Sequence, residues 1–530
     1  MKRKMLIRLM AASIAAVMAV GMTGCGGNSN DQPANNDQIT GGDTQANAGD
    51  QTTGGETKTD AEQKTGDEEQ GTTAAADDGM PEVRIDPKTG EPFDLGGMDI
   101  IITDWWTDPD KVEYDTDFKE AQKEYRDWLQ ETYHFTMVQK NYAGWGWGEG
   151  SIGEKFVQAA TSGSDENIIY ILTNSTATAA DVSQGLMYDL TKLDGDVVDF
   201  SEERWQVNGE INNWKIGDSS YCFYSGPSEP RGGLYFNKTV LKDAGIDPET
   251  IYDMQADGTW TWDAWVDIMD KVQRDIDNDG QIDVYGCVQN NGGMVSMCIR
   301  SNGGALVSKE DDRTYALTAD SDEVREALHF AIDTVTNKYF LNYSNEGGTN
   351  WEEYKSLFMS GKAAFMFDDA YAAYKGNWLT GQSSKDVNGV KLDQSIDYGF
   401  VIFPKGPKGD VATNQSNNPL CMPASYSDEK ARLLMFAYDV WEDEVPGYEG
   451  YYALLDDLYG GMKDTRSVDE TIPLMATHGV IDLHELVPNF NVKDDFLWKM
   501  SVGADVDAIL EQNLPAWQTA VDEFNATLQK

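Results

Sequence analysis

Between residues 97 and 530, short apolar runs alternate with longer segments in which apolar positions recur every three or four residues. The short runs predict buried strands at 98–103, 135–138, 167–172, 363–367 and 398–403. The longer segments predict helices at 118–129, 152–160, 261–272, 321–337, 427–441 and 506–528. Because nearly continuous apolar strands alternate with helices, the pattern predicts an α/β fold whose parallel sheet is covered on both faces.

The first 25 residues have the layout of a bacterial export signal. Basic residues at positions 2–4 and 8 precede an apolar run that is too short for a stable membrane span. The run ends in Met22-Thr23-Gly24-Cys25, which resembles a lipobox, although the first position of that motif is usually Leu. The resemblance implies cleavage before Cys25 and attachment of lipid to it. An ordinary secretory signal is the alternative.

Residues 26–80 contain almost no apolar side chain larger than alanine. They carry 12 acidic and 2 basic residues among Asn, Gln, Gly and Thr. Such a segment buries too little surface to offset its ordering entropy, so we expect a disordered acidic tether. No later stretch approaches 18 continuous apolar residues, so the lipid is the expected contact with the membrane, on the extracellular face of a bacterial cell.

Charge and composition exclude some classes of protein. The chain has 91 acidic and 41 basic residues and a formal net charge of −50, which argues against nucleic-acid binding. Its 40% apolar content suffices for a large core, and 530 residues predict two lobes or more. The remaining cysteines are widely spaced without a C-x-x-C pair, so we expect buried thiols and no zinc site, with one disulfide left open. They are Cys222, Cys287, Cys298 and Cys421.

Six local motifs occur in a fixed order along the folded part of the chain. They are Gly185-Leu-Met-Tyr-Asp-Leu190, Gly233-Leu-Tyr-Phe-Asn-Lys238, Leu241-Lys-Asp-Ala-Gly-Ile-Asp247, Thr259-Trp-Thr-Trp-Asp-Ala-Trp265, Phe358-Met-Ser-Gly-Lys-Ala-Ala-Phe-Met366 and Tyr398-Gly-Phe-Val-Ile-Phe-Pro404. The ordered set resembles the maltose-binding-protein-like extracellular solute-binding proteins (family 1) of carbohydrate ABC importers. The chain departs from the family pattern in its greater length and in segment 442–489, which matches no motif of the family.

The resemblance implies a two-lobe periplasmic-binding-protein-like fold with a ligand cleft and a hinge between the lobes. Lobe 1 would comprise about 97–228 and 411–441, and lobe 2 about 233–405 and 442–530. The first crossing would lie at 227–232. The expected function is capture of a sugar or oligosaccharide and its delivery to ABC permease subunits, by a monomer that is not an enzyme.

Sugar recognition needs flat aromatic surfaces and planar hydrogen-bonding groups. Trp105 and Trp106 follow the first predicted strand, where the ligand loops of an α/β sheet are found. Trp145 and Trp147 lie in a glycine-rich loop that leaves their rings unobstructed, and core packing is the equal alternative. The polar and aromatic candidates that remain are Asn174, Arg231, Asn291, Asp369, Tyr371, Trp378 and Asn414.

Two further motifs bear on cofactors. Residues 148–153 match G-x-G-x-x-G, but the preceding strand is polar and no acidic residue is placed for a ribose, so we expect no dinucleotide. Residues 275–283 place oxygen-bearing side chains and Gly280 as in an EF-hand loop, although position 12 is Gly286. A structural Ca²⁺ and an acidic turn without metal are equal alternatives. The calcium candidates are Asp275, Asp277, Asp279, Gln281 and Asp283.

Three other functions remain open at this point. A surface enzyme acting on glycans would use paired carboxylates, which 91 acidic residues make unavoidable in sequence. A glycan-adhesion lipoprotein would need neither hinge nor importer. A peptide-binding uptake protein would favour a pocket for charged termini over one lined by aromatic rings.

Overall fold

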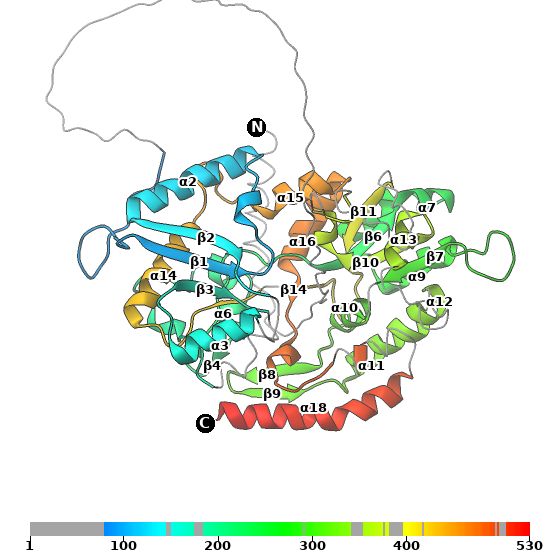
Figure 1. Ribbon diagram of the computed structural model, residues 1–530. Coiled ribbons are helices and arrows are strands. Elements are labelled where there is room, and N and C mark those ends of the chain that lie inside the picture. Colours follow the sequence, from blue (N-terminus) through cyan, green and yellow to red (C-terminus); the bar gives the residue numbers. More distant parts are fainter. Residues whose placement is uncertain are drawn as a thin grey trace, which may run out of the picture. The chain divides into compact units, whose positions relative to one another are not determined.

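The computed structural model describes 79–144, 150–173, 184–289, 292–340, 353–374, 377–380, 396–415, 418–492, 496–497 and 505–529. Residues from Val83 to the C-terminus belong to one compact unit. Two four-stranded sheets organise this unit, and each is the centre of one lobe (Figure 1).

The first sheet has the strand order β13-β3-β1-β2. Its strands are β1 (Met98–Asp104), β2 (Phe135–Asn141), β3 (Asn167–Ile171) and β13 (Leu420–Cys421). Strand β1 pairs in parallel with both β2 and β3. The connections through α2 (Asp117–Tyr133) and α3 (Ile152–Ser162) therefore run in opposite directions across the sheet, and right-handed crossovers place these helices on opposite faces. Helix α14 (Asp428–Trp441) packs against β3 and α2.

The second sheet has the order β11-β6-β10-β7. Its strands are β6 (Gly232–Asn237), β7 (Tyr285–Gln289), β10 (Ala363–Asp369) and β11 (Tyr398–Ile402). Every residue of β6, β10 and β11 is buried, and for β10 and β11 the continuous apolar runs predict this. Strands β10 and β7 are parallel, so both end at the same edge of the sheet.

The prediction of a parallel sheet is confirmed for β1 with β2 and β3 and for β7 with β10, but each sheet also contains antiparallel pairing. Strand β6 is antiparallel to β10 and β11, and β13 is antiparallel to β3. An apolar run shows that both faces of a strand are covered, but it carries no information on strand direction. Strand β6 follows the crossing at 227–232, and β13 follows the segment that contains β12. Each of these two strands therefore enters its sheet from the other lobe.

The predicted helix starts are confirmed at two caps. The Thr261 hydroxyl accepts a hydrogen bond from the Ala264 N–H (3.2 Å), and the Ser427 hydroxyl accepts one from the Lys430 N–H (3.2 Å). The helix expected over 321–337 is α11 (Asp322–His329) followed by a π-helical turn, η3 (Phe330–Thr336), and α12 (Asn337–Tyr339).

The remaining elements connect or cover the two sheets. The helices and helical turns are η1 (Pro109–Lys111), η2 (Leu190–Lys192), α5 (Glu203–Gln206), α6 (Glu210–Asn213), α7 (Lys238–Asp243), α8 (Glu249–Asp257), α9 (Trp262–Val272), α10 (Gly293–Ser301), α13 (Glu353–Met359), η4 (Ala370–Ala373), α15 (Leu454–Gly461), η5 (Ser467–Thr471), α16 (Ile472–Thr477), η6 (Leu483–Leu486) and α18 (Val506–Leu528). The short strands are β4 (Lys215–Ile216), β5 (Ser219–Ser220), β8 (Val307–Asp311), β9 (Thr314–Leu317), β12 (Thr413–Asn414) and β14 (Gly479–Val480).

Three chain segments lie side by side between the sheets. The Gly232 N–H donates to the Asn414 Oδ1 (2.6 Å), and the Thr413 hydroxyl donates to the Gly232 carbonyl (3.0 Å). Strand β12 pairs in parallel with β14 on its other side. A side chain at position 232 would place its Cβ 2.6 Å from the Asn414 Oδ1, so only glycine permits this close approach. The lobe boundaries given above stay a prediction.

The segment after α14, which matches no family motif, contacts elements of both lobes. The Thr116 hydroxyl at the start of α2 donates to Asp456 (2.6 Å), and the Lys119 ammonium pairs with Asp457 (2.9 Å). Helix α15, which carries both aspartates, also packs against η4 and η5 of the second lobe. Segment 442–461 therefore acts as a third connection between the lobes.

Two groups of ion pairs fasten the start of the described chain to α14. The Arg84 guanidinium pairs with Asp439 and Asp443, the latter at 2.6 Å. The Asp86 carboxylate accepts two hydrogen bonds from the Arg432 guanidinium, at 2.6 and 3.1 Å. Residues 84–86 are thereby joined to the first lobe.

The four cysteines that the structure describes are buried, so the expectation of buried thiols is confirmed. Burial raises the pKa of the Cys287 and Cys298 thiols above the ordinary value. These thiols are therefore protonated at neutral pH and are poor nucleophiles.

Candidate functional site

An exposed aromatic segment follows the central strand of the first lobe. Seven large apolar side chains of the described residues are exposed, and Trp106 (51%), Val112 (49%) and Tyr114 (46%) all lie between β1 and α2. Trp105 is half-buried, and its ring contacts that of Trp106 edge to face at 4.7 Å. The predicted aromatic pair thus comprises one ring packed on the lobe and one open to solvent.

Asp104 at the end of β1 shapes the turn that presents these rings. Its Oδ1 accepts hydrogen bonds from the Trp106 N–H (3.0 Å) and the Thr107 N–H (2.8 Å). Its Oδ2 accepts from the Gln139 amide (2.8 Å) and from the Thr107 hydroxyl. With four donors, this fully buried carboxylate is saturated by the protein itself.

A cluster of charged and aromatic side chains lies where the crossing segment meets β10. The Arg231 guanidinium pairs with Glu229 (2.9 Å), which also accepts a hydrogen bond from the Tyr374 hydroxyl (2.6 Å). The same guanidinium lies over the Tyr371 ring, 5.3 Å from its centroid. The structure thus brings together three of the predicted ligand residues, namely Arg231, Asp369 and Tyr371, and adds Glu229 and Tyr374.

Burial dominates the electrostatics of this cluster. It raises the pKa of the Asp369 carboxyl to about 7, although the neighbouring Arg231 guanidinium acts in the opposite direction. Asp368 and Glu229 add like-charge repulsion, and Arg300 adds a weaker attraction. Burial works against the charge of Arg231 too, but Glu229 and Asp369 outweigh it and raise its pKa. Asp369 is therefore close to half-protonated at neutral pH.

The remaining predicted residues lie in different surroundings. The Asn414 Oδ1 accepts from the Gly232 N–H, and the side chain is buried. Trp378 is half-buried, with the Lys355 ammonium 5.0 Å from its ring centroid. Trp145, Trp147, Asn174, Asn291 and Cys25 lie outside the described residues. Ligand contact by all these side chains stays a prediction.

One polar side chain at this edge was missed in the sequence. Gln289, the last residue of β7, is buried, and neither its Oε1 nor its Nε2 has a hydrogen-bond partner among the described residues. A polar residue at the end of an apolar strand resembles many ordinary strand ends, so no signal in the sequence distinguishes it. Glu229 lies next to Pro230 at the predicted crossing. Its position there is a signal from which it could have been predicted as a site residue.

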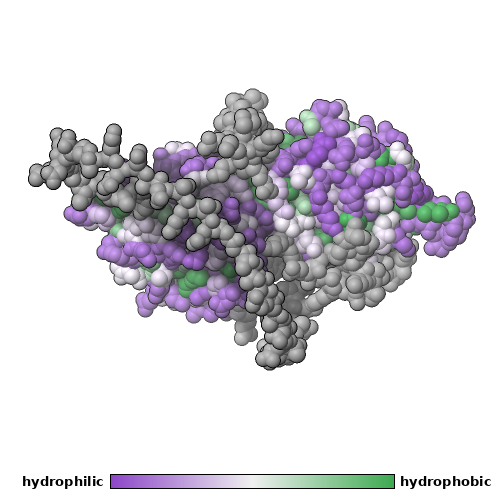
Figure 2. Space-filling view, turned by 90° about the horizontal axis from the view of Figure 1, so that it is seen from above, coloured by the Kyte–Doolittle hydropathy of each residue, from purple (hydrophilic) through white to green (hydrophobic). Residues whose placement is uncertain are grey.

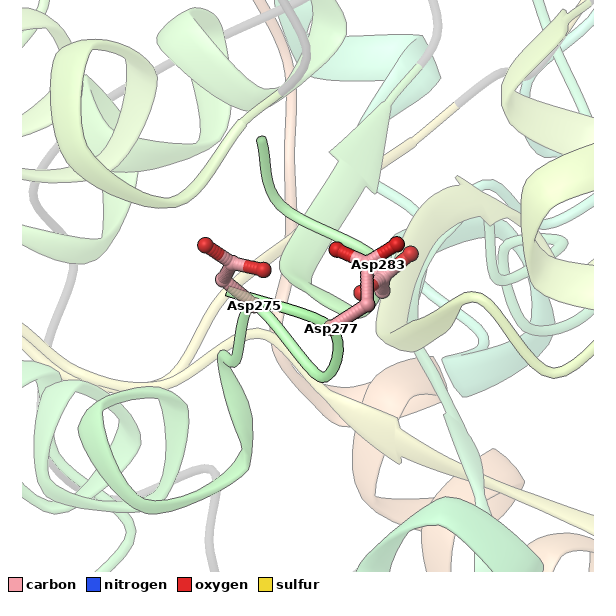
Figure 3. Close-up of side chains that lie close together, drawn as sticks. All are labelled: Asp275, Asp277 and Asp283. Carbon is pink, nitrogen blue, oxygen red and sulfur yellow. The ribbon is translucent and has the colours of Figure 1, made fainter. Parts of the chain in front are cut away.

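The predicted calcium loop connects α9 to β7. One carboxylate oxygen from each of Asp275, Asp277 and Asp283 lies within 4.8 Å of the other two (Figure 3). The Gly280 N–H donates to Asp275 (2.8 Å), and the Ile276 N–H donates to Asp283 (2.7 Å). Asp279 and Gln281 are not part of this group, so the structure brings together three of the five candidates.

Hydrophilic residues cover much of the visible surface of the described chain, in agreement with its high charge (Figure 2). In the part of the chain that the structure describes, no helix is long and apolar enough to span a bilayer.

Two α/β lobes joined by three crossing segments, with aromatic and charged side chains at the ends of their central strands, define a two-lobe binding protein. The profile of the bacterial extracellular solute-binding proteins matches residues 112–439, which is more than half of the sequence. The chain therefore belongs to the bacterial extracellular solute-binding protein family. The comparison with curated proteins found no match.

Solved structures show the same fold at low sequence identity. A sugar transporter of Rhizobium etli in an open conformation aligns with a TM-score of 0.53 and 18% identity, over 80% of this chain and 99% of that one. The cyclic α-maltosyl-1,6-maltose binding protein of Arthrobacter globiformis aligns with a TM-score of 0.51 and 16% identity, over 82% and 100%. UgpB of Mycobacterium tuberculosis in complex with glycerophosphocholine gives 0.50 and 15%, over 81% and 99%.

Proposed function

We propose that this protein captures an uncharged sugar or oligosaccharide outside the cell and delivers it to an ABC importer. The exposed Trp106 indole at the carboxyl end of β1 is the observation that carries the proposal. The indole is 51% exposed, so removing its apolar surface from water would be favourable. The apolar face of a pyranose ring could cover it in this way. The solved relatives named for a sugar or a cyclic maltosyl sugar support the same ligand class.

Capture would proceed through closure of the lobes. A ligand that contacts the rings of the first lobe and the polar cluster of the second gains both sets of contacts only when the lobes approach each other. The crossing at 227–232, strand β12 and segment 442–461 are the parts that would absorb the rotation. The permease would then recognise the closed, liganded form.

The chain would reach the importer through a lipid on Cys25 and the acidic tether of residues 26–80. Replacing Cys25 by Ala should move the full-length protein from the detergent phase to the aqueous phase in a phase-partition assay. Partition of the variant into detergent would contradict the lipid anchor. We further propose that the protein acts as a monomer and is not an enzyme.

The test of ligand capture is calorimetric titration of the mature full-length chain with glucose, maltose, cellobiose, xylobiose and mannobiose, and with a tripeptide. We expect saturable binding of at least one sugar, and mass spectrometry should recover that sugar intact. Hydrolysis of the sugar would indicate a glycan-active enzyme. Binding of the peptide alone would indicate a peptide-uptake protein.

A second proposal concerns metal, and the geometry of the acidic loop carries it. Ca²⁺ binds oxygens at about 2.3–2.6 Å, so two ligands of one ion lie at most about 5 Å apart, and the Asp275, Asp277 and Asp283 oxygens meet this limit. Bound Ca²⁺ would cross-link the loop between α9 and β7. Calcium should raise the thermal midpoint of the wild type but not of Asp277→Asn, and an equal response of both proteins would contradict the site.

A further inference from the structure

Gln289 is an exception among the buried glutamines that the structure describes. It is 1% exposed, yet both ends of its amide lack a hydrogen-bond partner. Gln255, which is 8% exposed, donates to the Thr471 hydroxyl (3.0 Å) and accepts from the Ile402 N–H (3.0 Å). Gln415 donates to Ser228. Because a buried amide without partners is costly, the unsatisfied state of Gln289 requires an explanation.

The strand register places Gln289 beside the charged cluster. Gln289 is opposite Phe367 in the parallel pair of β7 and β10, so the two side chains lie on the same face of the sheet. Asp369 is two residues beyond Phe367 and shares that face, at the edge where both strands end. Rise and strand spacing put the Cα atoms of Gln289 and Asp369 about 8 Å apart.

Two members of the cluster also have unused hydrogen-bonding capacity. The Arg231 Nε is buried without an acceptor. The Asp369 carboxylate accepts no hydrogen bond from the described residues, in contrast to Asp368, which accepts one from the Tyr354 hydroxyl (3.0 Å). This edge of the second sheet therefore presents an amide, a carboxylate and an N–H group that all lack partners.

We propose that Gln289 is a specificity-determining residue of the ligand site, whose amide binds two neighbouring hydroxyl groups of an uncharged sugar. This inference rests on the proposed function. The Oε1 would accept from one hydroxyl while the Nε2 donates to the next, which matches the spacing of a vicinal diol. Asp369 would accept from a further hydroxyl, and the Arg231 Nε would donate to a ring or hydroxyl oxygen.

The charges around this edge favour an uncharged ligand over an anionic one. Three carboxyl groups, of Glu229, Asp368 and Asp369, lie near two guanidinium groups, of Arg231 and Arg300. The Arg300 guanidinium is already paired with Asp482 (2.8 Å), and Arg231 is paired with Glu229. A phosphate or carboxylate on the ligand would therefore meet repulsion without a free cation to offset it.

The test compares Gln289→Leu with the matched variant Gln255→Leu in the mature full-length chain, using the five sugars named above and glucose 6-phosphate. Leu replaces the Gln289 amide with a side chain of similar size that needs no partner. We expect Gln289→Leu to weaken sugar binding about 10- to 100-fold without lowering the thermal midpoint of the ligand-free protein. Gln255→Leu should lower the midpoint and leave the affinity unchanged, and glucose 6-phosphate should not bind the wild type.

Monodeoxy derivatives of the tightest-binding sugar refine the test. Removal of a hydroxyl that Gln289 contacts should weaken binding to the wild type but have little effect in Gln289→Leu. Sugar binding by the wild type with unchanged affinity in Gln289→Leu would overturn this inference and leave the proposed function intact. A midpoint lowered as much as in Gln255→Leu would show a structural role and overturn it as well. If the wild type binds none of the sugars, the proposed function fails first and this inference fails with it.

Discussion

At the carboxyl end of β1 the Asp104 carboxylate accepts four hydrogen bonds from its own lobe, whereas at the carboxyl end of β10 the Asp369 carboxylate accepts none from the described residues. Asp104 fixes a turn and leaves the Trp106 ring exposed. Asp369 is buried beside Arg231 and Gln289, which also have unused hydrogen-bonding capacity. The first lobe thus offers a preformed apolar surface, and the second offers polar groups that the described residues leave without hydrogen-bond partners.

Replacing Arg231 by Met tests the polar side of this comparison most strongly. The variant leaves the buried Asp369 and the half-buried Glu229 without their nearest cation, so we expect a loss of about 3–5 kcal/mol in the free energy of unfolding. Urea denaturation measures it. Arg231→Lys, which keeps the charge, should lose less. A loss below about 1 kcal/mol in the Met variant would show that the cluster is already solvated.

Replacing Asp104 by Ala tests the turn of the first lobe. The substitution leaves the N–H groups of Trp106 and Thr107 without their acceptor, which should lower the free energy of unfolding by about 2–3 kcal/mol. Sugar affinity should fall with it, because the rings lose their support. The control is Asp108→Ala, which removes the cap of the exposed turn η1 and should change both quantities little. Equal losses in the two variants would contradict a special role of Asp104.

Replacing Trp106 by Ala should separate binding from stability. The ring is exposed, so the free energy of unfolding should change by less than about 0.5 kcal/mol, while sugar affinity should fall about tenfold. Calorimetry and urea denaturation give the two quantities. Ile276→Ala, at a side chain that is 61% exposed on the acidic loop, should affect neither. Unchanged affinity in Trp106→Ala would remove the main support for the aromatic surface.

The smallest expected effect is the pH dependence that Asp369 contributes. Burial raises its pKa from 3.8 to about 7, so between these values the folded protein retains a proton that the unfolded chain has released. The free energy of unfolding should therefore decrease as the pH rises, by about 1 kcal/mol between pH 6 and 8.

The matched control is Asp369→Asn, which cannot titrate and should lack this contribution. The Asp439 carboxyl, whose pKa burial raises to about 6, contributes with the same sign in both proteins. The difference between the two stability profiles therefore isolates Asp369. Identical slopes from pH 6 to 8 would show that Asp369 is ionised throughout this range.

Local patterns predicted the positions of elements well and their directions poorly. The caps at Thr261 and Ser427 and the buried runs of β10 and β11 depend on neighbours within a few residues, so the sequence contains them. The direction of β6 and the two-residue strand β13 depend on contacts between residues that are distant in sequence, such as Gly232 with Asn414 and Ile171 with Leu420. A hydropathy pattern does not predict contacts between residues that are distant in sequence.

The site shows the same division. The adjacent rings of Trp105 and Trp106 in a polar setting were readable as a ligand surface, and the structure exposes one of them. Arg231 could be placed at a crossing because the family resemblance implies the first crossing at 227–232. Gln289 became noticeable only through its register with Phe367 and its lack of partners, and both are properties of packing between strands that are distant in sequence.

The ion pairs of Arg84 and Asp86 with α14 have a mechanical consequence. Any pull on the N-terminal end of the chain is transmitted to α14 and the first sheet before it reaches the crossing segments. The second lobe is reached through the crossing segments and through contacts such as the ion pair of Lys215 with Asp312 (3.1 Å), so it lies further from that load. If the chain is attached to a surface at its N-terminus, the first lobe would therefore stay fixed relative to that surface. The second lobe would be the one that rotates when the lobes close.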